Sequence, residues 1–158
     1  MASTEQEGAL ALPQFEGFSP NILLVVAPFY RQIADNLIAG AAATLKAAGA
    51  THDVIEVPGA LEVPTAIRMA HQRGGYEGYV ALGCIIRGET YHFELVCNES
   101  GRGLTLLGLE GLAIGNGILT PETMAQAVVR ADPDDMDKGG GAAAACLHLV
   151  ALARRFAG

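Results

Sequence analysis

The segment 83–92 joins residue types that could bind an anion and move a proton. It reads Gly-Cys-Ile-Ile-Arg-Gly-Glu-Thr-Tyr-His and overlaps an apolar run that predicts a buried strand over 79–86. The strand breaks at Arg87-Gly88, and a helix is expected to begin near Thr90. Free backbone N–H groups at a helix N-terminus favour phosphate or carboxylate, and His92 in the first turn would be a proton-transfer group beside them. The pattern predicts chemistry on a small phosphorylated molecule.

Alternating apolar runs and amphipathic stretches predict the elements that position this segment. Strands are expected over 22–27, 53–57, 79–86 and 112–119, and helices over 34–48, 64–72, 90–107, 121–130 and 142–157. This alternation predicts an α/β fold, a three-layer, flavodoxin-like sandwich whose four-stranded parallel sheet carries helices on both faces. Residues 1–20 show no period and are expected to form an N-terminal arm, and residues 21–158 a single domain.

Two boundaries in the C-terminal half follow from short local patterns. Thr120-Pro121-Glu122 combines an N-cap residue, a first-position proline and a first-turn acid, which predicts a helix start. Residues 132–141 are polar and glycine-rich, and they predict a loop. The helix after this loop is expected to bury one face, formed by Ala142, Cys146, Leu149, Ala153 and Phe156.

Composition narrows the classes of function. The 158 residues are 51% hydrophobic and 17% charged, with a mean hydropathy of +0.31, yet Gly, Pro or charge interrupts every apolar run before it could span a membrane. The surplus apolar surface is therefore expected to pack against another subunit. A net charge of −7 argues against a nucleic-acid partner but does not exclude a phosphorylated substrate.

The cysteines and the N-terminal residues indicate a reducing compartment. Cys84, Cys97 and Cys146 are odd in number and form no CxxC pair, and the four histidines show no HxxxH spacing. Neither disulfides nor a metal site are therefore expected. Residues 1–8 lack the basic and apolar regions of a signal peptide, so a cytoplasmic location is expected.

The residues just after the predicted strands define where a ligand should bind. In an open parallel sheet, ligands bind beyond the carboxyl ends of the strands. The residues expected there are Phe29, 59–62, 87–92 and 116–120. They include an aromatic ring, a carboxylate, an anion-binding turn and a histidine, which predict a small-molecule site but no particular reaction.

Six segments make the chain recognisable between about residues 20 and 157. They are Val-Pro-Gly-Ala-Leu-Glu-Val-Pro at 57–64, Ala-Leu-Gly-Cys-Ile-Ile-Arg-Gly-Glu-Thr-Tyr-His at 81–92, Val-Cys-Asn-Glu at 96–99, Gly-Ile-Leu-Thr at 117–120, Gln-Ala with Arg at 126–130, and Asp-Lys-Gly at 137–139. In these segments, their order and their spacing, the chain resembles the lumazine synthase family of riboflavin biosynthesis. The resemblance implies condensation of 5-amino-6-(D-ribitylamino)uracil with 3,4-dihydroxy-2-butanone 4-phosphate to 6,7-dimethyl-8-ribityllumazine, phosphate and water. It implies no metal or redox cofactor.

The resemblance also implies roles for individual residues, with His92 as the proton carrier. The positions that match the family's substrate-binding residues are Phe29 (pyrimidine stacking), Ala60, Leu61 and Glu62 (ribityl chain), Cys84, Ile85 and Ile86 (pyrimidine edge), Gly88, Glu89 and Thr90 (phosphate), and Asn116, Arg130 and Lys138 (from a neighbouring subunit). Arg130 would pair with the phosphate.

Assembly and partners follow from the same resemblance. The family's common unit is a pentamer, and some members join twelve pentamers into a shell. The acidic loop 132–137 predicts a pentamer that does not close into a shell, because its like charges would repel. Inorganic phosphate is expected as a ligand, and riboflavin synthase is a candidate partner. Many members carry an aromatic residue where Asn116 stands, so binding of the pyrimidine is expected to be weaker here.

Two other functions fit parts of the sequence. Asn116 leaves open a low-turnover flavin- or lumazine-binding or scaffold member of the same family, and a flavodoxin-like electron-transfer domain shares the sheet type. A scaffold needs no such set of residues as Glu62, Thr90, His92, Arg130 and Lys138. The first strand is not followed by the Ser/Thr-rich phosphate loop of a flavodoxin. Each of three residues taken singly also fits a structural role. His92 could be a helix-start residue, Arg130 a cation at a helix C-terminus, and Cys84 a small apolar residue at a strand end.

Overall fold

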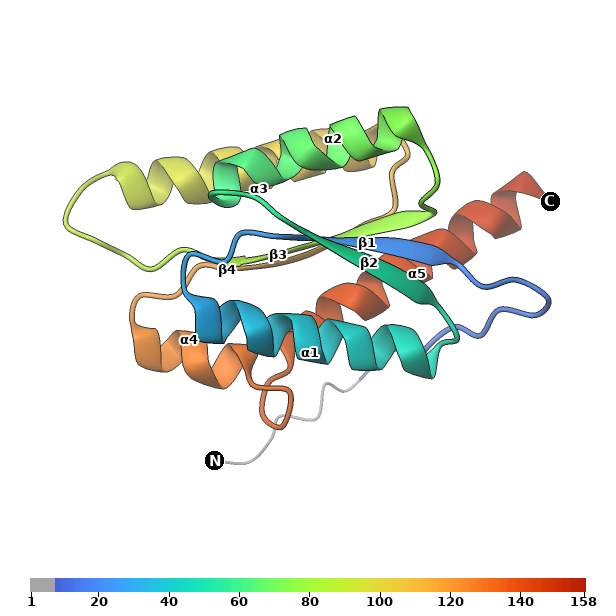
Figure 1. The fold of residues 1–158 in the computed structure, drawn as a ribbon, viewed down its shortest axis with the longest axis horizontal. Helices are drawn as coiled ribbons and strands as arrows, with labels where there is room; N and C mark the ends of the chain where they lie inside the picture. Colours follow the sequence, from blue (N-terminus) through green and yellow to red (C-terminus); the bar gives the residue numbers. More distant parts are fainter. Residues whose placement is uncertain (1–7) are drawn as a thin grey trace.

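The computed structural model describes residues 8–158 and confirms the α/β fold. Its four-stranded sheet is entirely parallel, in the order β2-β1-β3-β4 (Figure 1). The strands are β1 (Asn21–Val26), β2 (Thr51–Glu56), β3 (Gly78–Cys84) and β4 (Ile114–Leu119). The central strands β1 and β3 are buried on both faces, which explains their continuous apolar sequence.

Helices cover both faces of this sheet and complete the three layers (Figure 1). One face carries α1 (Arg31–Ala47), α4 (Met124–Ala131) and α5 (Lys138–Ala157), and the other carries the 3-10 turn η1 (Ala60–Glu62), α2 (Val63–Arg73) and α3 (His92–Leu109). Successive residues of β1 point to opposite faces. Leu24 therefore packs in the core beneath α1 and α5, whereas Leu23 packs in the core beneath α2 and α3.

Helix α5 packs very closely against both the sheet and α1. A Cβ atom at Gly115 of β4 would overlap the carbonyl oxygen of Ala142, and one at Gly139 would overlap the carbonyl oxygen of Leu37 in α1. These two glycines let α5 approach both elements at backbone distance. The predicted loop over 132–141 is therefore wrong in its last four residues, because Gly139 and Gly140 are helical despite their low propensity.

The buried face of α5 also differs from the predicted one. Its buried residues are Gly139, Gly140, Ala142, Ala143, Cys146, Leu147 and Val150. Leu149 and Phe156, predicted to be buried, are 41% and 79% exposed, and Ala153 is exposed as well. Leu149 lies on the outward side of α5, since its neighbour Val150 is buried. Ala153 and Phe156 are exposed because the end of α5 extends past the sheet, so the last turns have no layer to pack against within this chain (Figure 1).

Helix α4 begins at Met124, three residues after the position predicted from the Thr-Pro-Glu pattern. Its N-cap is Thr123, whose hydroxyl accepts a hydrogen bond from the Gln126 N–H at 3.3 Å. Pro121 lies in the connection before it, where its carbonyl oxygen accepts a hydrogen bond from the Arg87 N–H at 3.2 Å. A tertiary contact to the connection after β3 thus takes precedence over the local helix-start signal.

The residues before β1 contain no helix or strand from position 8 onward. Leu12, Phe15 and Phe18 nevertheless pack against the core beneath α1 and α5. The guanidinium carbon of Arg154 lies 3.7 Å from the centre of the Phe18 ring, which ties this segment to α5. The predicted arm over 1–20 begins outside the described residues. No helix within residues 8–158 is both long and apolar enough to cross a membrane.

Candidate active site

The carboxyl ends of the strands meet along one edge of the sheet and are joined to each other there. The Val57 N–H after β2 donates to the carbonyl oxygen of Val26 at 2.8 Å, and the Ile85 N–H after β3 donates to that of Leu119 at 2.8 Å. These bonds continue the parallel ladders by one residue and fix where each connection leaves the sheet. The connections that carry the predicted site residues therefore start from a rigid edge.

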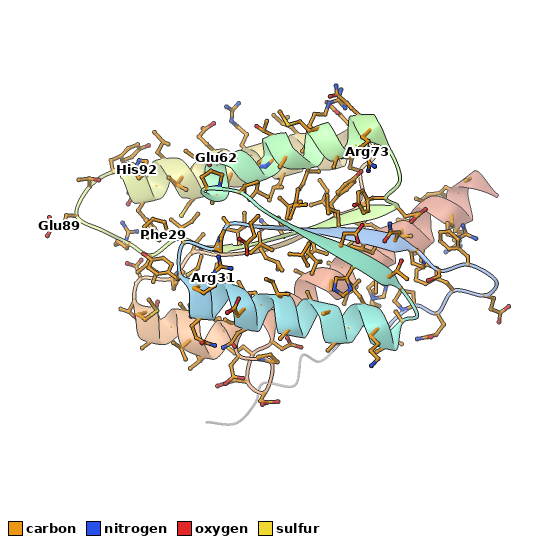
Figure 2. The ribbon with its side chains drawn as sticks, viewed as in Figure 1. Phe29, Arg31, Glu62, Arg73, Glu89 and His92 are labelled. Carbon is orange, nitrogen blue, oxygen red and sulfur yellow. The ribbon has the colours of Figure 1, made fainter. Side chains whose placement is uncertain are left out.

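A cavity of about 360 Å³, called here the histidine cavity, lies at this edge. It is lined by Ala27, Phe29, Tyr30, Pro58, Gly59, Ala60, Leu61, Glu62, Cys84, Ile85, Ile86, His92 and Val96. Eight of these residues were predicted as site residues, so the structure brings the pyrimidine, ribityl and proton-transfer positions together in one cavity. Figure 2 shows Phe29, Glu62 and His92 at the same end of the molecule.

Local structure sets each of these side chains in place. Phe29 follows β1 and is 76% exposed, and its ring forms a T-shaped pair with that of Tyr30, with ring centres 5.0 Å apart, so most of the Phe29 ring is accessible to a ligand. The turn η1 places Glu62 at the mouth of the cavity, where the Glu62 N–H donates to the Gly59 carbonyl oxygen at 3.1 Å. His92 is exposed in the first turn of α3, and Val96 lies one helical turn further along.

Gly59 was expected at this edge as part of 59–62, whereas Ala27, Tyr30, Pro58 and Val96 were not predicted as lining residues. Sequence signals for the last three were present: Tyr30 adjoins Phe29, Pro58-Gly59 opens the 57–64 segment, and Val96 follows His92 at helical spacing.

The histidine cavity has an acidic side chain in its described lining but no lysine or arginine. Glu62 contributes the carboxylate. Burial raises the pKa of the Cys84 thiol to about 11, so this thiol stays neutral near pH 7 and is a poor nucleophile. The cavity alone can orient a neutral ring and move a proton, but it offers no side-chain cation to a phosphate group.

The predicted phosphate-binding residues Gly88, Glu89 and Thr90 lie on the exposed connection between β3 and α3. They do not line the histidine cavity, and Figure 2 shows Glu89 at the tip of this connection. The Thr90 hydroxyl accepts a hydrogen bond from the His92 N–H at 3.3 Å. Thr90 thereby links the connection to the first residue of α3.

A second cavity of about 910 Å³, called here the basic cavity, contains the remaining predicted residues. It lies between β4, α4 and the start of α5, and it is named for Arg130 and Lys138, which line it together with Asn116 and the carboxylates of Glu122, Asp135 and Asp137. The Arg130 guanidinium donates to the carbonyl oxygen of Gln126 at 3.0 Å, and the Asn116 side-chain oxygen accepts from the Ile118 N–H at 3.0 Å. None of Asn116, Arg130 and Lys138 lines the histidine cavity, so one chain separates the predicted site into two parts.

Asp137 holds Lys138 at the mouth of the basic cavity. It has a left-handed φ of 45°, and its side chain accepts a hydrogen bond from the Gly140 N–H at 3.0 Å, capping α5. A Cβ atom at Gly40 of α1 would overlap this carboxylate. Burial raises the pKa of Asp137, the bond from Gly140 opposes that shift, and Asp134 adds to it. The direction in which Lys138 leaves the helix therefore depends on Asp137.

Within residues 8–158, no group of three or more His, Cys, Asp or Glu side chains is arranged to hold a metal ion.

Comparison with known proteins places the chain in a family. Residues 19–154 match the family model described as 6,7-dimethyl-8-ribityllumazine synthase. Three relatives carry that name. The protein of Novosphingobium aromaticivorans is 59% identical over 134 residues, covering 85% of this chain and 96% of its own length. The protein of Azorhizobium caulinodans is 54% identical over 161 residues, covering 98% of this chain and 98% of its own length. The protein of a Jannaschia species is 51% identical over 147 residues, covering 93% of this chain and 82% of its own length. The chain therefore belongs to the 6,7-dimethyl-8-ribityllumazine synthase family of transferases.

Proposed function

We propose that this chain condenses 5-amino-6-(D-ribitylamino)uracil with 3,4-dihydroxy-2-butanone 4-phosphate to give 6,7-dimethyl-8-ribityllumazine, phosphate and water in riboflavin biosynthesis. The observation that carries the proposal is the lining of the histidine cavity. Its exposed aromatic face, its backbone edge at 84–86 and its histidine fit a flat heterocycle on which a proton is transferred. The family relationship supports the substrate pair.

The reaction needs two oriented substrates and mobile protons. Amine attack on the ketone, loss of phosphate and ring closure each transfer protons, and His92 is the group proposed to carry them. Phe29 is proposed to stack on the pyrimidine, and Glu62 with its neighbours to hold the ribityl chain. The chemistry proposed here requires no metal or redox cofactor.

The complete site is proposed to form between two chains. A bound phosphate ester is anionic, and cations are absent from the described lining of the histidine cavity but present in the basic cavity as Arg130 and Lys138. Placing the basic cavity of one chain against the histidine cavity of its neighbour supplies the missing charge. Exposed apolar side chains on α3 support such a contact, namely Leu95, Leu106 and Leu109.

A ring of five chains is the proposed assembly. Five chains of 16.4 kDa give about 82 kDa, whereas a sixty-chain shell gives about 984 kDa. Asp132, Asp134, Asp135 and Asp137 crowd the connection before α5, and their mutual repulsion is proposed to stop the ring from closing into a shell. Sedimentation at moderate salt separates these masses. A species near 984 kDa would contradict the argument from charge, and a stable monomer would contradict the shared site.

Turnover of the purified chain with both substrates tests the function, and mixed assemblies test the sharing. Co-expressed His92→Ala and Arg130→Ala chains, each impaired alone, would form intact sites wherever a normal histidine cavity meets a normal basic cavity. Random mixing makes about one contact in four intact, so about a quarter of wild-type activity should return. Mixtures no more active than the two variants alone would place both residues in one chain's site. Absence of product from the wild-type chain would reject the function.

A low-turnover ligand-binding member of the family is the second candidate. Its support is Asn116, whose side chain is bound to the Ile118 N–H and offers no ring for stacking. A product-formation rate close to zero with tight lumazine binding would favour it. A cytoplasmic location and an association with riboflavin synthase remain proposals of the same kind, and fractionation and co-sedimentation test them.

A further inference from the structure

Arg87 is the most connected side chain of the connection between β3 and α3. Its Nε donates to a carboxylate oxygen of Glu122 at 2.5 Å, and its Nη1 donates to Glu94. The guanidinium carbon lies 4.4 Å from the centre of the Phe93 ring. The Arg87 N–H donates to the carbonyl oxygen of Pro121 at 3.2 Å. One residue thus contacts the first turn of α3 and the connection after β4.

Little else fixes the residues that follow Arg87. Gly88, Glu89 and Thr90 are exposed, and Thr90 makes a local bond to the His92 N–H. Within the described residues, no side chain of residues 88–91 forms a hydrogen bond to a strand or to any helix other than α3. The position of this turn therefore depends on Arg87, on one side through Glu94 and on the other through Glu122.

The same contacts argue against a direct role in substrate binding. Both edges of the guanidinium fork are occupied by carboxylates, and the Arg87 side chain lowers the pKa of Glu94, so the two stay oppositely charged. Arg87 lines neither the histidine cavity nor the basic cavity. Glu122 and Pro121, in contrast, line the basic cavity. Arg87 therefore connects the turn beside His92 to the wall of the other cavity.

We infer that Arg87 is a positioning residue. It holds the turn 88–90 and the N-terminus of α3, with His92, in the place where the phosphorylated substrate binds. This inference rests on the proposed function. Exposed ion pairs contribute little to folding, so losing this clamp should affect site geometry far more than stability. A displaced catalytic group lowers the rate of reaction by up to about a hundredfold.

Arg87→Ala is the test, and Arg102→Ala is its matched control, because Arg102 pairs with Glu99 further along the same helix. Steady-state kinetics should be measured for both substrates, with the assembly mass and the melting temperature of each variant. For Arg87→Ala, we expect KM for the butanone phosphate to rise about tenfold and kcat to fall by a similar factor. KM for the pyrimidine and the melting temperature should match those of Arg102→Ala.

Conservative variants separate positioning from a purely structural role. Lysine can reach one carboxylate at a time, so Arg87→Lys should recover part of the loss. Glu94→Gln and Glu122→Gln should each show part of the kinetic defect of Arg87→Ala. Equal changes in both KM values, or kinetics of Arg87→Ala equal to those of Arg102→Ala, would overturn the inference and leave the function standing. Wild-type protein that forms no product would reject the function, and the inference with it.

Discussion

The histidine cavity and the basic cavity differ in what they offer a ligand. The first has an aromatic face, exposed backbone and a histidine, but no lysine or arginine in its described lining. The second has Arg130 and Lys138 but no histidine in its described lining. Each therefore lacks what the other provides. The comparison teaches that one fold can keep two sets of groups apart, so the reaction proposed above would need two chains to bring them together.

His92→Ala should lower the reaction rate more than any other variant described here, and it tests the role proposed for the histidine cavity. The variant should fold and assemble, since His92 is exposed in the first turn of α3. A positioned acid–base group contributes about 10²–10⁴-fold, and the low end is expected because solvent can supply some protons. Single-turnover kinetics should show a loss of roughly 10²-fold. An unchanged chemical step would remove His92 from its assigned role.

Arg130→Ala tests the basic cavity in the same way. A charge-assisted hydrogen bond contributes about 1.5–3 kcal/mol, so KM for the butanone phosphate should rise about tenfold to a hundredfold while KM for the pyrimidine changes little. Inorganic phosphate should inhibit the wild-type chain competitively and the variant more weakly. Arg73→Ala is the control, because Arg73 is also an arginine in the last turn of a helix but lines neither cavity. Similar increases in both KM values would show that Arg130 does not recognise phosphate.

Variants of Asp137 test the basic cavity more finely, because they alter the start of α5 while leaving the side chain of Lys138 present. Asp137→Ala loses the cap on Gly140 and should lower the free energy of unfolding by about 0.5–2 kcal/mol. Asp137→Asn keeps an acceptor and tolerates a left-handed φ, so its loss should be smaller. Because burial raises the pKa of Asp137, the contribution of this residue to the stability of the wild-type chain grows as pH falls through that pKa.

Urea unfolding at fixed protein concentration measures these differences. The gap between Asp137→Asn and wild type should widen on acidification, because only the wild-type chain gains stability when residue 137 takes up a proton. Alanine and asparagine variants of equal stability would show that the cap contributes nothing.

Alkylation of thiols should have the smallest effect on turnover. Burial raises the pKa of Cys84 to about 11 and that of Cys146 to about 12, so both thiols stay protonated and shielded near pH 7. Iodoacetamide at pH 7 should label Cys84 and Cys146 when the chain is unfolded in urea. In the native chain it should leave both residues unlabelled and the activity unchanged. Rapid loss of activity with label on Cys84 would mean that the histidine cavity contains a reactive nucleophile.

The fold was predictable wherever burial dominates the sequence. Strands β1 and β3 are buried on both faces, so their unbroken aliphatic runs located them to within two residues at each end. The starts of α4 and α5 were wrong because contacts between distant segments decide them. Gly139 is helical since α5 must pass close to Leu37, a residue far away in the sequence. No local propensity contains that information.

The site was predictable as a set of residues but not as an arrangement. Segments such as 57–64 and 81–92 identified the lining of the histidine cavity, because the residues that follow parallel strands meet at one edge. Their spacing could not show that Arg87 pairs with Glu122, which lies 35 residues further along the chain. The mouth of the basic cavity likewise depends on how α5 packs, which the sequence pattern misjudged.

The close approach of α5 to the sheet has a consequence for the order of folding during synthesis. Ala143, Cys146, Leu147 and Val150 fill the core beneath α1, and Ala142 lies against β4. Until residues 138–157 have left the ribosome, the part of that face over β3 and β4 stays open to water and to other nascent chains. Parallel sheets form slowly because their contacts are non-local. The chain is thus exposed to aggregation until its last helix is made, so slowed translation of that segment should increase its dependence on chaperones.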